Sequence, residues 1–179
     1  MDYTIEVHNH NLAAWVAATA ARASNRCRFS VQAGKKVLED SGFTPKFDLS
    51  SLPSQKNTDG VHKEWRGKVI EAAQAQGIAF TNGIAAKLIN CYLKARFVCG
   101  GHHAEESVKA LHPPIDAILL AGLIISDPPV PFQNEWEKHR NTRWSKLNSK
   151  DYQAIIDLVR KTMKGQPLWM VEEYWKGHQ

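Results

Sequence analysis

Apolar side chains recur along this chain mostly at helical spacing. Val61, Trp65, Val69 and Ala72 are separated by four, four and three residues, and the stretch 148–164 follows a similar pattern. Such spacing places side chains on one face of an α-helix, whereas a half-buried strand alternates apolar and polar residues. No pair of alternating segments suggests a hairpin. The pattern therefore predicts an all-α protein, a compact bundle of about seven helices.

Capping residues and helix-ending glycines set the expected limits of these helices. Ser, Thr, Asn or Asp precedes most of the apolar stretches, and Gly42, Gly77 and Gly165 follow three of them. The expected helices are residues 9 or 11 to 24, 31–41, 58 or 59 to 76, 83–99, 115–126, 148 or 149 to 164, and 167–175.

The chain of 179 residues is long enough for one all-α domain, 1–179. Residues 43–58 contain two prolines and many small polar side chains, and a loop of that length is long for a compact domain. We therefore expect a mobile loop at 43–58 and a C-terminal helical segment at 148–176.

The most apolar stretch follows the Pro113-Pro114 pair. From Ile115 to residue 125 the side chains are apolar, apart from one glycine and Asp116. A helix that is apolar on every side is normally buried, and this one is too short to cross a bilayer, which needs roughly 20 residues. We therefore expect residues 115–126 to form the central helix of the bundle.

Asp116 is the first candidate for chemistry. In the first turn of a helix the macrodipole stabilises a carboxylate by about 0.3–1 kcal/mol, and this effect alone accounts for an acid there. Alternatively, an acid at the edge of an apolar helix can have a raised pKa and act as a general base or as an electrostatic stabiliser. His112 precedes it by four residues and can form a His–Asp pair with it if the proline turn brings the two together.

Composition narrows the class of protein. The net charge is +5 and the isoelectric point is near 9.1, which fits contact with a polyanion, although many basic proteins bind none. Cys27, Cys91 and Cys99 are odd in number and follow no disulfide spacing, which favours a reducing compartment. Because no apolar signal region opens the chain, we expect a cytoplasmic protein that does not bind a membrane.

Neither a metal nor a cofactor is expected. The spacing of Cys99, His102 and His103 matches no zinc-binding pattern, and no second cysteine pair is present. The chain also lacks the glycine motifs that bind nucleotide phosphates.

The motifs suggest two resemblances. The combination of AAW…AARA at 13–23 with HPPIDAILL at 112–120 resembles a group of small helical bacterial proteins without assigned function. In addition, residues 70–125 are similar to the helix-hairpin-helix DNA glycosylases. The similarity lies in the glycine-bearing turn Thr81-Asn82-Gly83, which opens a helix, and in the later Pro-x-Asp at the head of an apolar helix. Members of that family are all-α proteins that cleave the N-glycosidic bond of a flipped base in DNA.

The glycosylase resemblance implies a site. The backbone amides of Asn82, Gly83 and Ile84 would hold a DNA phosphate. Asp116 would assist cleavage of the N-glycosidic bond, with His112 beside it. Lys87 would be a Schiff-base amine, although the residue pattern favours a solvated surface lysine.

Basic and aromatic side chains supply further candidates for nucleic-acid contact. Lys94 belongs to a polar stripe of the helix at 83–99, and Arg140, Arg143 and Trp144 belong to a stretch that mixes tryptophans with cations. Aromatic rings flanked by cations suit base stacking with phosphate contact. Alternatively, the tryptophans fill the bundle and the charges are solvated.

Three functions remain open at this stage. The first is a glycosylase-type enzyme acting on DNA, the second a nucleic-acid-binding or protein-binding module without catalysis, and the third a small-molecule-binding protein whose pocket is headed by His112 and Asp116. The surroundings of Asp116 distinguish them, because the enzyme needs this acid in a cleft and the amides of 82–84 free.

Overall fold

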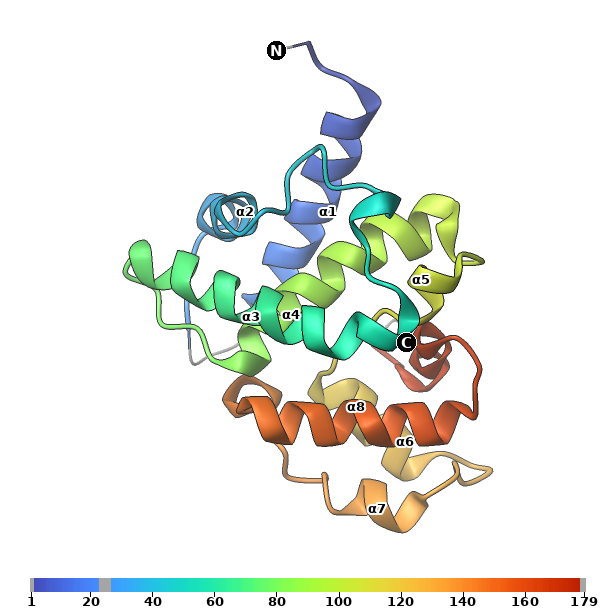
Figure 1. Ribbon diagram of the computed structural model, residues 1–179. Helices are drawn as coiled ribbons and strands as arrows, with labels where there is room; N and C mark the ends of the chain where they lie inside the picture. The colour runs from blue at the N-terminus through green and yellow to red at the C-terminus, as the bar shows by residue number, and fades with distance from the viewer. Residues whose placement is uncertain (1, 23–26, 178–179) are drawn as a thin grey trace.

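The computed structural model describes residues 2–22 and 27–177, and every regular element in these ranges is helical, as predicted. Figure 1 shows the arrangement. The α-helices are α1 (Ile5–Ala21), α2 (Val31–Asp40), α3 (Thr58–Ala75), α4 (Asn82–Leu93), α5 (Glu106–Lys109), α6 (Ala117–Ile125), α7 (Gln133–Glu137) and α8 (Ser149–Met163). The shorter or irregular turns are η1 (Leu49–Ser51), η2 (Gln55–Asn57), the π-helical η3 (Lys94–His102), η4 (Trp144–Lys146) and η5 (Leu168–Tyr174).

Local capping explains most helix starts. The side chains of Ser30, Thr81 and Asn148 accept hydrogen bonds from backbone amides in the first turns of α2, α4 and α8, which confirms three of the predicted caps. The first helix begins earlier than predicted, because Thr4 caps it in place of Asn9 or Asn11. The expected end of that helix, at about Ser24, lies outside the described residues.

The central helix of the bundle is α4. All of its residues from Gly83 to Leu93 are buried, and it packs against α1, α2, α3 and α8. The alanines along α1 allow close approach of its neighbours. A Cβ atom added to Gly34 of α2 would lie only 2.7 Å from Cβ of Ala18, so the two helices are in tight contact.

The prediction that residues 115–126 form the central helix is wrong. Helix α6 lies at the edge of the molecule, with Ile118 45% and Ile125 70% exposed. Its other side packs against α7 and the C-terminal segment, where Gly122 lets the backbone of Tyr174 approach closely. An all-apolar helix thus need not be central, because hydrophobicity does not by itself determine how many neighbours a helix has.

The apolar side chains form two clusters. The first joins α1–α4, and the second joins α6, α7, α8 and η5. Figure 1 shows α6–α8 on one side of α3 and α4, with α1 and α2 on the other. Trp144 packs against both clusters. No helix in the described ranges is long and apolar enough to span a bilayer.

The segment 43–58, expected to be mobile, is attached to the core by specific contacts. Phe43 is buried beside Phe47 and Trp65, and the guanidinium of Arg96 donates a hydrogen bond to the carbonyl of Pro45 at 2.7 Å. The turns η1 and η2 form within it, and Asp48 caps the first. The segment therefore connects α2 and α3 with several contacts to the core.

Candidate functional site

A cavity of about 380 Å³ lies between α1, α4 and the C-terminal segment. Its apolar wall comes from α1, through Leu12, Val16 and Ala20. Its polar wall comes from α4, η3, the start of α6 and the C-terminal segment, through Lys87, Cys91, Lys94, Cys99, Asp116, Glu172 and Trp175. Pro114 and Ala95 complete the lining. Two of the three predicted catalytic residues, Lys87 and Asp116, therefore meet in one cavity.

The carboxylate of Asp116 has two separate sets of partners. Oδ1 accepts the backbone N–H of Leu119 at 2.9 Å and caps α6. Oδ2 accepts from Nζ of Lys87 at 2.7 Å and from the indole Nε1 of Trp175 at 3.0 Å. The side chains of Lys87 and Asp116 are 7% and 16% exposed, so this ion pair is largely withdrawn from solvent and still borders the cavity.

Asp116 is a carboxylate at neutral pH. Burial by itself would raise its pKa, but the ammonium of Lys87, the Leu119 amide and the Trp175 indole outweigh burial and leave the pKa below the ordinary value. The alternative of a raised pKa at this position is therefore wrong. The group suits stabilisation of positive charge or acceptance of a hydrogen bond more than donation of a proton.

The cavity residues of α4 and of the first position of η3 lie on one helix face. Lys87, Cys91 and Lys94 are four and three residues apart, so they line successive turns of the same side. Lys94 forms an ion pair with Glu172 of η5. Burial raises the pKa of Glu172, against the opposing effect of Lys94, and burial raises the pKa of the Cys91 thiol to about 11. Cys91 is therefore a neutral thiol, and two lysines face two carboxyl groups.

At the predicted phosphate site, residues 82–84, the amides of Gly83 and Ile84 are not free to meet a ligand. The N–H of Gly83 donates to the carbonyl of Leu147 at 3.1 Å, and the N–H of Ile84 donates to Oγ1 of Thr81 at 3.2 Å. A Cβ atom on Gly83 would lie 1.8 Å from the carbonyl oxygen of Trp144. The segment 144–147 therefore covers this turn, and neither amide can receive a phosphate.

The four candidates for nucleic-acid contact lie in different settings. Lys94 faces the cavity, and Arg140 forms a bidentate ion pair with Glu137 at 2.7 Å. Arg143 is exposed just before η4. The ring of Trp144 is half-buried and lies 5.9 Å from Nζ of Lys87, so it fills the bundle rather than presenting a free stacking face.

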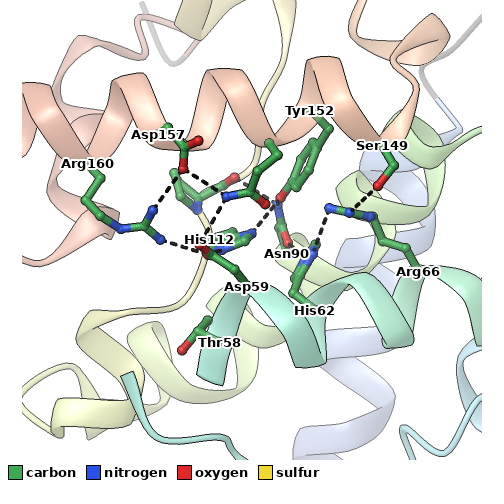
Figure 2. Close-up of polar contacts among 12 residues, drawn as sticks. Thr58, Asp59, His62, Arg66, Asn90, His112, Ser149, Tyr152, Asp157 and Arg160 are labelled. Atoms are coloured by element: carbon green, nitrogen blue, oxygen red, sulfur yellow. Dashed lines mark hydrogen bonds and ion pairs between the residues drawn. The ribbon is translucent and has the colours of Figure 1, made fainter. Parts of the chain in front are cut away.

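His112 pairs with a different acid from the one predicted. It lies in a buried layer of polar side chains between α3 and α8, shown in Figure 2. Its Nε2 lies 2.8 Å from Oδ1 of Asp59, and its Nδ1 lies 3.1 Å from the hydroxyl of Tyr152. The prolines that follow His112 separate it from Asp116, so the expected His112–Asp116 pair is wrong.

The same layer continues through α4 towards the start of α8. Nδ2 of Asn90 donates to the hydroxyl of Tyr152 at 3.0 Å, and Oδ1 of Asn90 lies 2.7 Å from Nε2 of His62. The guanidinium of Arg66 donates to Nδ1 of His62 at 3.2 Å. Together with the two bonds of His112, these hydrogen bonds form a chain from Arg66 to Asp59. Every bond in this chain has one donor and one acceptor only if both histidines are neutral and carry their proton on Nε2.

The enclosure of this polar layer indicates that it supports the fold. The hydroxyl of Tyr152 and the amide of Asn90 are enclosed, and neither residue lines a cavity found in the described part of the chain. Burial lowers the pKa of both His62 and His112. The layer therefore holds α3, α4, α8 and the segment leading to Asp116 in fixed positions.

Sequence reasoning missed Glu172 and Trp175 in the cavity and Asp59 in the buried layer. Asp59 lies 53 residues before its partner His112, and Trp175 lies 59 residues after Asp116, so no local spacing links them. The spacing of Lys87, Cys91 and Lys94 was an available signal, because it indicates one helix face that carries both lysines.

No three His, Cys, Asp or Glu side chains in residues 2–22 and 27–177 are grouped so that they could hold a metal ion. Comparisons of the chain with protein-family models, with curated proteins and with solved structures found no match. The geometry of the cavity is therefore the main indication of function.

Proposed function

We propose that the cavity between α1, α4 and the C-terminal segment binds a small, uncharged and largely apolar molecule, whose polar atoms meet the Lys87–Asp116 pair. One observation carries this proposal: an ion pair of 2.7 Å, largely shielded from water, borders a cavity of about 380 Å³ with an apolar opposite wall. Small-molecule sites commonly have this size and this combination of apolar lining with a few converging polar groups.

The charges of the lining support an uncharged ligand. Lys87 and Lys94 are balanced by Asp116 and Glu172, so the cavity has no excess of either sign to attract a phosphate or an ammonium group. Nζ of Lys87 has three donors and uses one on Asp116, which leaves donors for a carbonyl oxygen or a ring nitrogen. A neutral heterocycle fits both conditions.

Binding of neutral heterocycles, with adenine and benzimidazole as probes, tests the proposal. Val16→Trp should fill the cavity from its apolar wall and abolish binding measured by NMR titration. Gln74→Trp, at an exposed position of α3, which does not line the cavity, should leave binding unchanged. Adding a phosphate to the probe, as in adenosine monophosphate, should weaken binding. Equal binding by both variants, or no binding of either neutral probe, would contradict the proposal.

A glycosylase-type reaction on DNA is the second candidate, and the contact between Lys87 and Asp116 favours it. The departing base would occupy the cavity as a neutral heterocycle. The carboxylate of Asp116 would stabilise the positive charge that develops on the sugar as the N-glycosidic bond breaks, and the ammonium of Lys87 would donate a proton to the departing base. Water, or the neutral amine then left on Lys87, would attack the sugar carbon and lose a proton to Asp116. The DNA phosphate would have to be held somewhere other than residues 82–84.

Base release from duplex and single-stranded DNA carrying damaged bases tests this second candidate. Asp116→Asn keeps the size of the side chain and should abolish release, and Lys87→Arg should keep the positive charge while removing the amine nucleophile. Circular dichroism checks that both variants remain folded. Release that persists in Asp116→Asn, or no release by the wild-type protein, would contradict the enzyme proposal while leaving the binding proposal intact.

A further inference from the structure

A hollow of about 510 Å³ lies between α3 and α8, away from the cavity described above. Its lining comes from these two helices alone and shares no residue with the lining of the cavity. Lys63 and Arg66 contribute from α3, and Ser149, Lys150 and Asp157 contribute from α8. Figure 2 shows Arg66 and Ser149 close together at the first turn of α8.

Positive charge predominates in this hollow. Three cations, Lys63, Arg66 and Lys150, line it with one acid, Asp157. That acid already has a partner outside the lining, because its Oδ1 accepts from Arg160 at 3.1 Å. Within residues 2–22 and 27–177, Lys63 and Lys150 form no hydrogen bond or ion pair. The hollow therefore has an uncompensated positive charge, in contrast to the balanced cavity.

Arg66 makes the site more than a patch of surface lysines. Its side chain is 1% exposed, and no carboxylate in the described part of the chain contacts it. Its guanidinium lies 4.3 Å from the centre of the Tyr152 ring, and its Nε has no hydrogen-bond partner. Withdrawing a guanidinium from water without a paired anion is costly, and burial accordingly lowers the pKa of Arg66. A bound anion would offset that cost.

Ser149 connects the buried guanidinium to the hollow. Its Oγ accepts a hydrogen bond from Arg66 at 3.1 Å, so its own hydroxyl hydrogen remains available as a donor. Ser149 is also the first residue of α8, a helix of 15 residues. The partial positive charge of that helix start therefore adjoins the hollow that Lys63 and Lys150 line, and the carboxylate of Asp151 in the same turn is already bonded to Nδ2 of Asn148.

We propose that this α3–α8 site binds a phosphate group, with Lys63 and Lys150 in contact with the phosphate oxygens and Ser149 donating to one of them. Arg66 supports the site from below through Ser149. The phosphate belongs either to a small phosphorylated molecule or to a nucleic-acid backbone. This site is independent of the cavity, because the cavity is proposed to take an uncharged molecule and has no lining residue in common with it.

Titration with inorganic phosphate, at constant ionic strength against chloride, tests the site by NMR and by the melting temperature. Replacing both Lys63 and Lys150 by Ala should weaken phosphate binding about tenfold, because two charge-assisted contacts are lost. The matched control replaces Lys68 and Lys161 by Ala, which removes the same charge from exposed positions of the same two helices outside the hollow. All four side chains are exposed, so both double variants should keep the wild-type melting temperature in the absence of phosphate.

Two outcomes would overturn the proposal. In the first, the wild-type protein responds to phosphate no more than it does to chloride. In the second, both pairs of substitutions weaken phosphate binding equally, which indicates a general charge effect. A second arm identifies the source of the phosphate. If adenosine monophosphate displaces inorganic phosphate and a short DNA duplex does not, the site binds small phosphorylated molecules. Displacement by the duplex that depends on Lys63 and Lys150 assigns it to a nucleic-acid backbone.

Discussion

Asn90→Leu is expected to be one of the most destabilising substitutions in this protein. Asn90 lies in the central helix and is 1% exposed. Leucine has a similar size and shape, so the substitution removes hydrogen bonds without leaving a large cavity. The change therefore isolates the contribution of the buried polar layer from that of apolar packing.

The structure gives the size of the expected effect. Asn90 donates to the carbonyl of Pro113 at 2.9 Å and to the hydroxyl of Tyr152 at 3.0 Å, and it accepts from Nε2 of His62 at 2.7 Å. Each hydrogen bond contributes about 1 kcal/mol net, and a buried group left without a partner costs about 1–3 kcal/mol. The carbonyl of Pro113 and the N–H of His62 would both lose their partners. We expect a loss of about 3–5 kcal/mol, a large part of the stability of a typical domain.

Urea unfolding monitored by circular dichroism measures this loss as a lower midpoint at unchanged slope. Asn141→Leu, at an exposed position, should change the free energy of unfolding by less than about 0.5 kcal/mol. Tyr152→Phe removes one of the same bonds, so its effect should be less than additive with that of Asn90→Leu. A loss below about 1 kcal/mol for Asn90→Leu would refute the assignment, because the freed groups would then have found other partners.

Two further predictions follow from the geometry. Burial lowers the pKa of His62 and His112, so at acid pH the unfolded chain binds protons that the folded chain does not. The free energy of unfolding should therefore fall by about 1.4 kcal/mol per pH unit for each histidine below about pH 6.5, as measured by urea titrations at several pH values. A flat profile would contradict this expectation. Gly122→Ala would place a Cβ atom 1.9 Å from the carbonyl oxygen of Tyr174, so it should displace the C-terminal segment, cost about 1–3 kcal/mol of stability and weaken heterocycle binding. Gly60→Ala has open space around it in α3 and should stabilise the protein by about 0.5–1 kcal/mol. Equal effects of the two substitutions in thermal unfolding would contradict the expected clash at Gly122.

The features that could be predicted from the sequence depend on near neighbours in the chain. The caps Ser30, Thr81 and Asn148 act on amides three residues away, so the starts of α2, α4 and α8 agree with the sequence pattern. The predicted start of the first helix is too late, because residues 5–11 contain no helix breaker and the helix extends back to Thr4, whose side chain accepts from the amide of Val7.

The features that could not be predicted depend on which helices meet. The central position of α4 follows from its contacts with helices from both halves of the chain, and polar residues such as Lys87 and Asn90 within it give no such indication. The cover over Gly83 comes from residues 144–147, about 60 positions later, and Asp59 finds His112 53 residues away. In each case the sequence contains both partners but no local pattern joins them.

Asp116 can cap α6 and also serve the cavity, because its carboxylate has two oxygens. Oδ1 satisfies the Leu119 amide at the start of α6, and Oδ2 faces Lys87, Trp175 and the cavity. Capping fixes the rotamer of the side chain, and a fixed rotamer aims the second oxygen at a constant position, which is the preorganisation that binding and electrostatic catalysis both require. The helix start thus orients the acid, and the function of the site depends on what meets the outward oxygen.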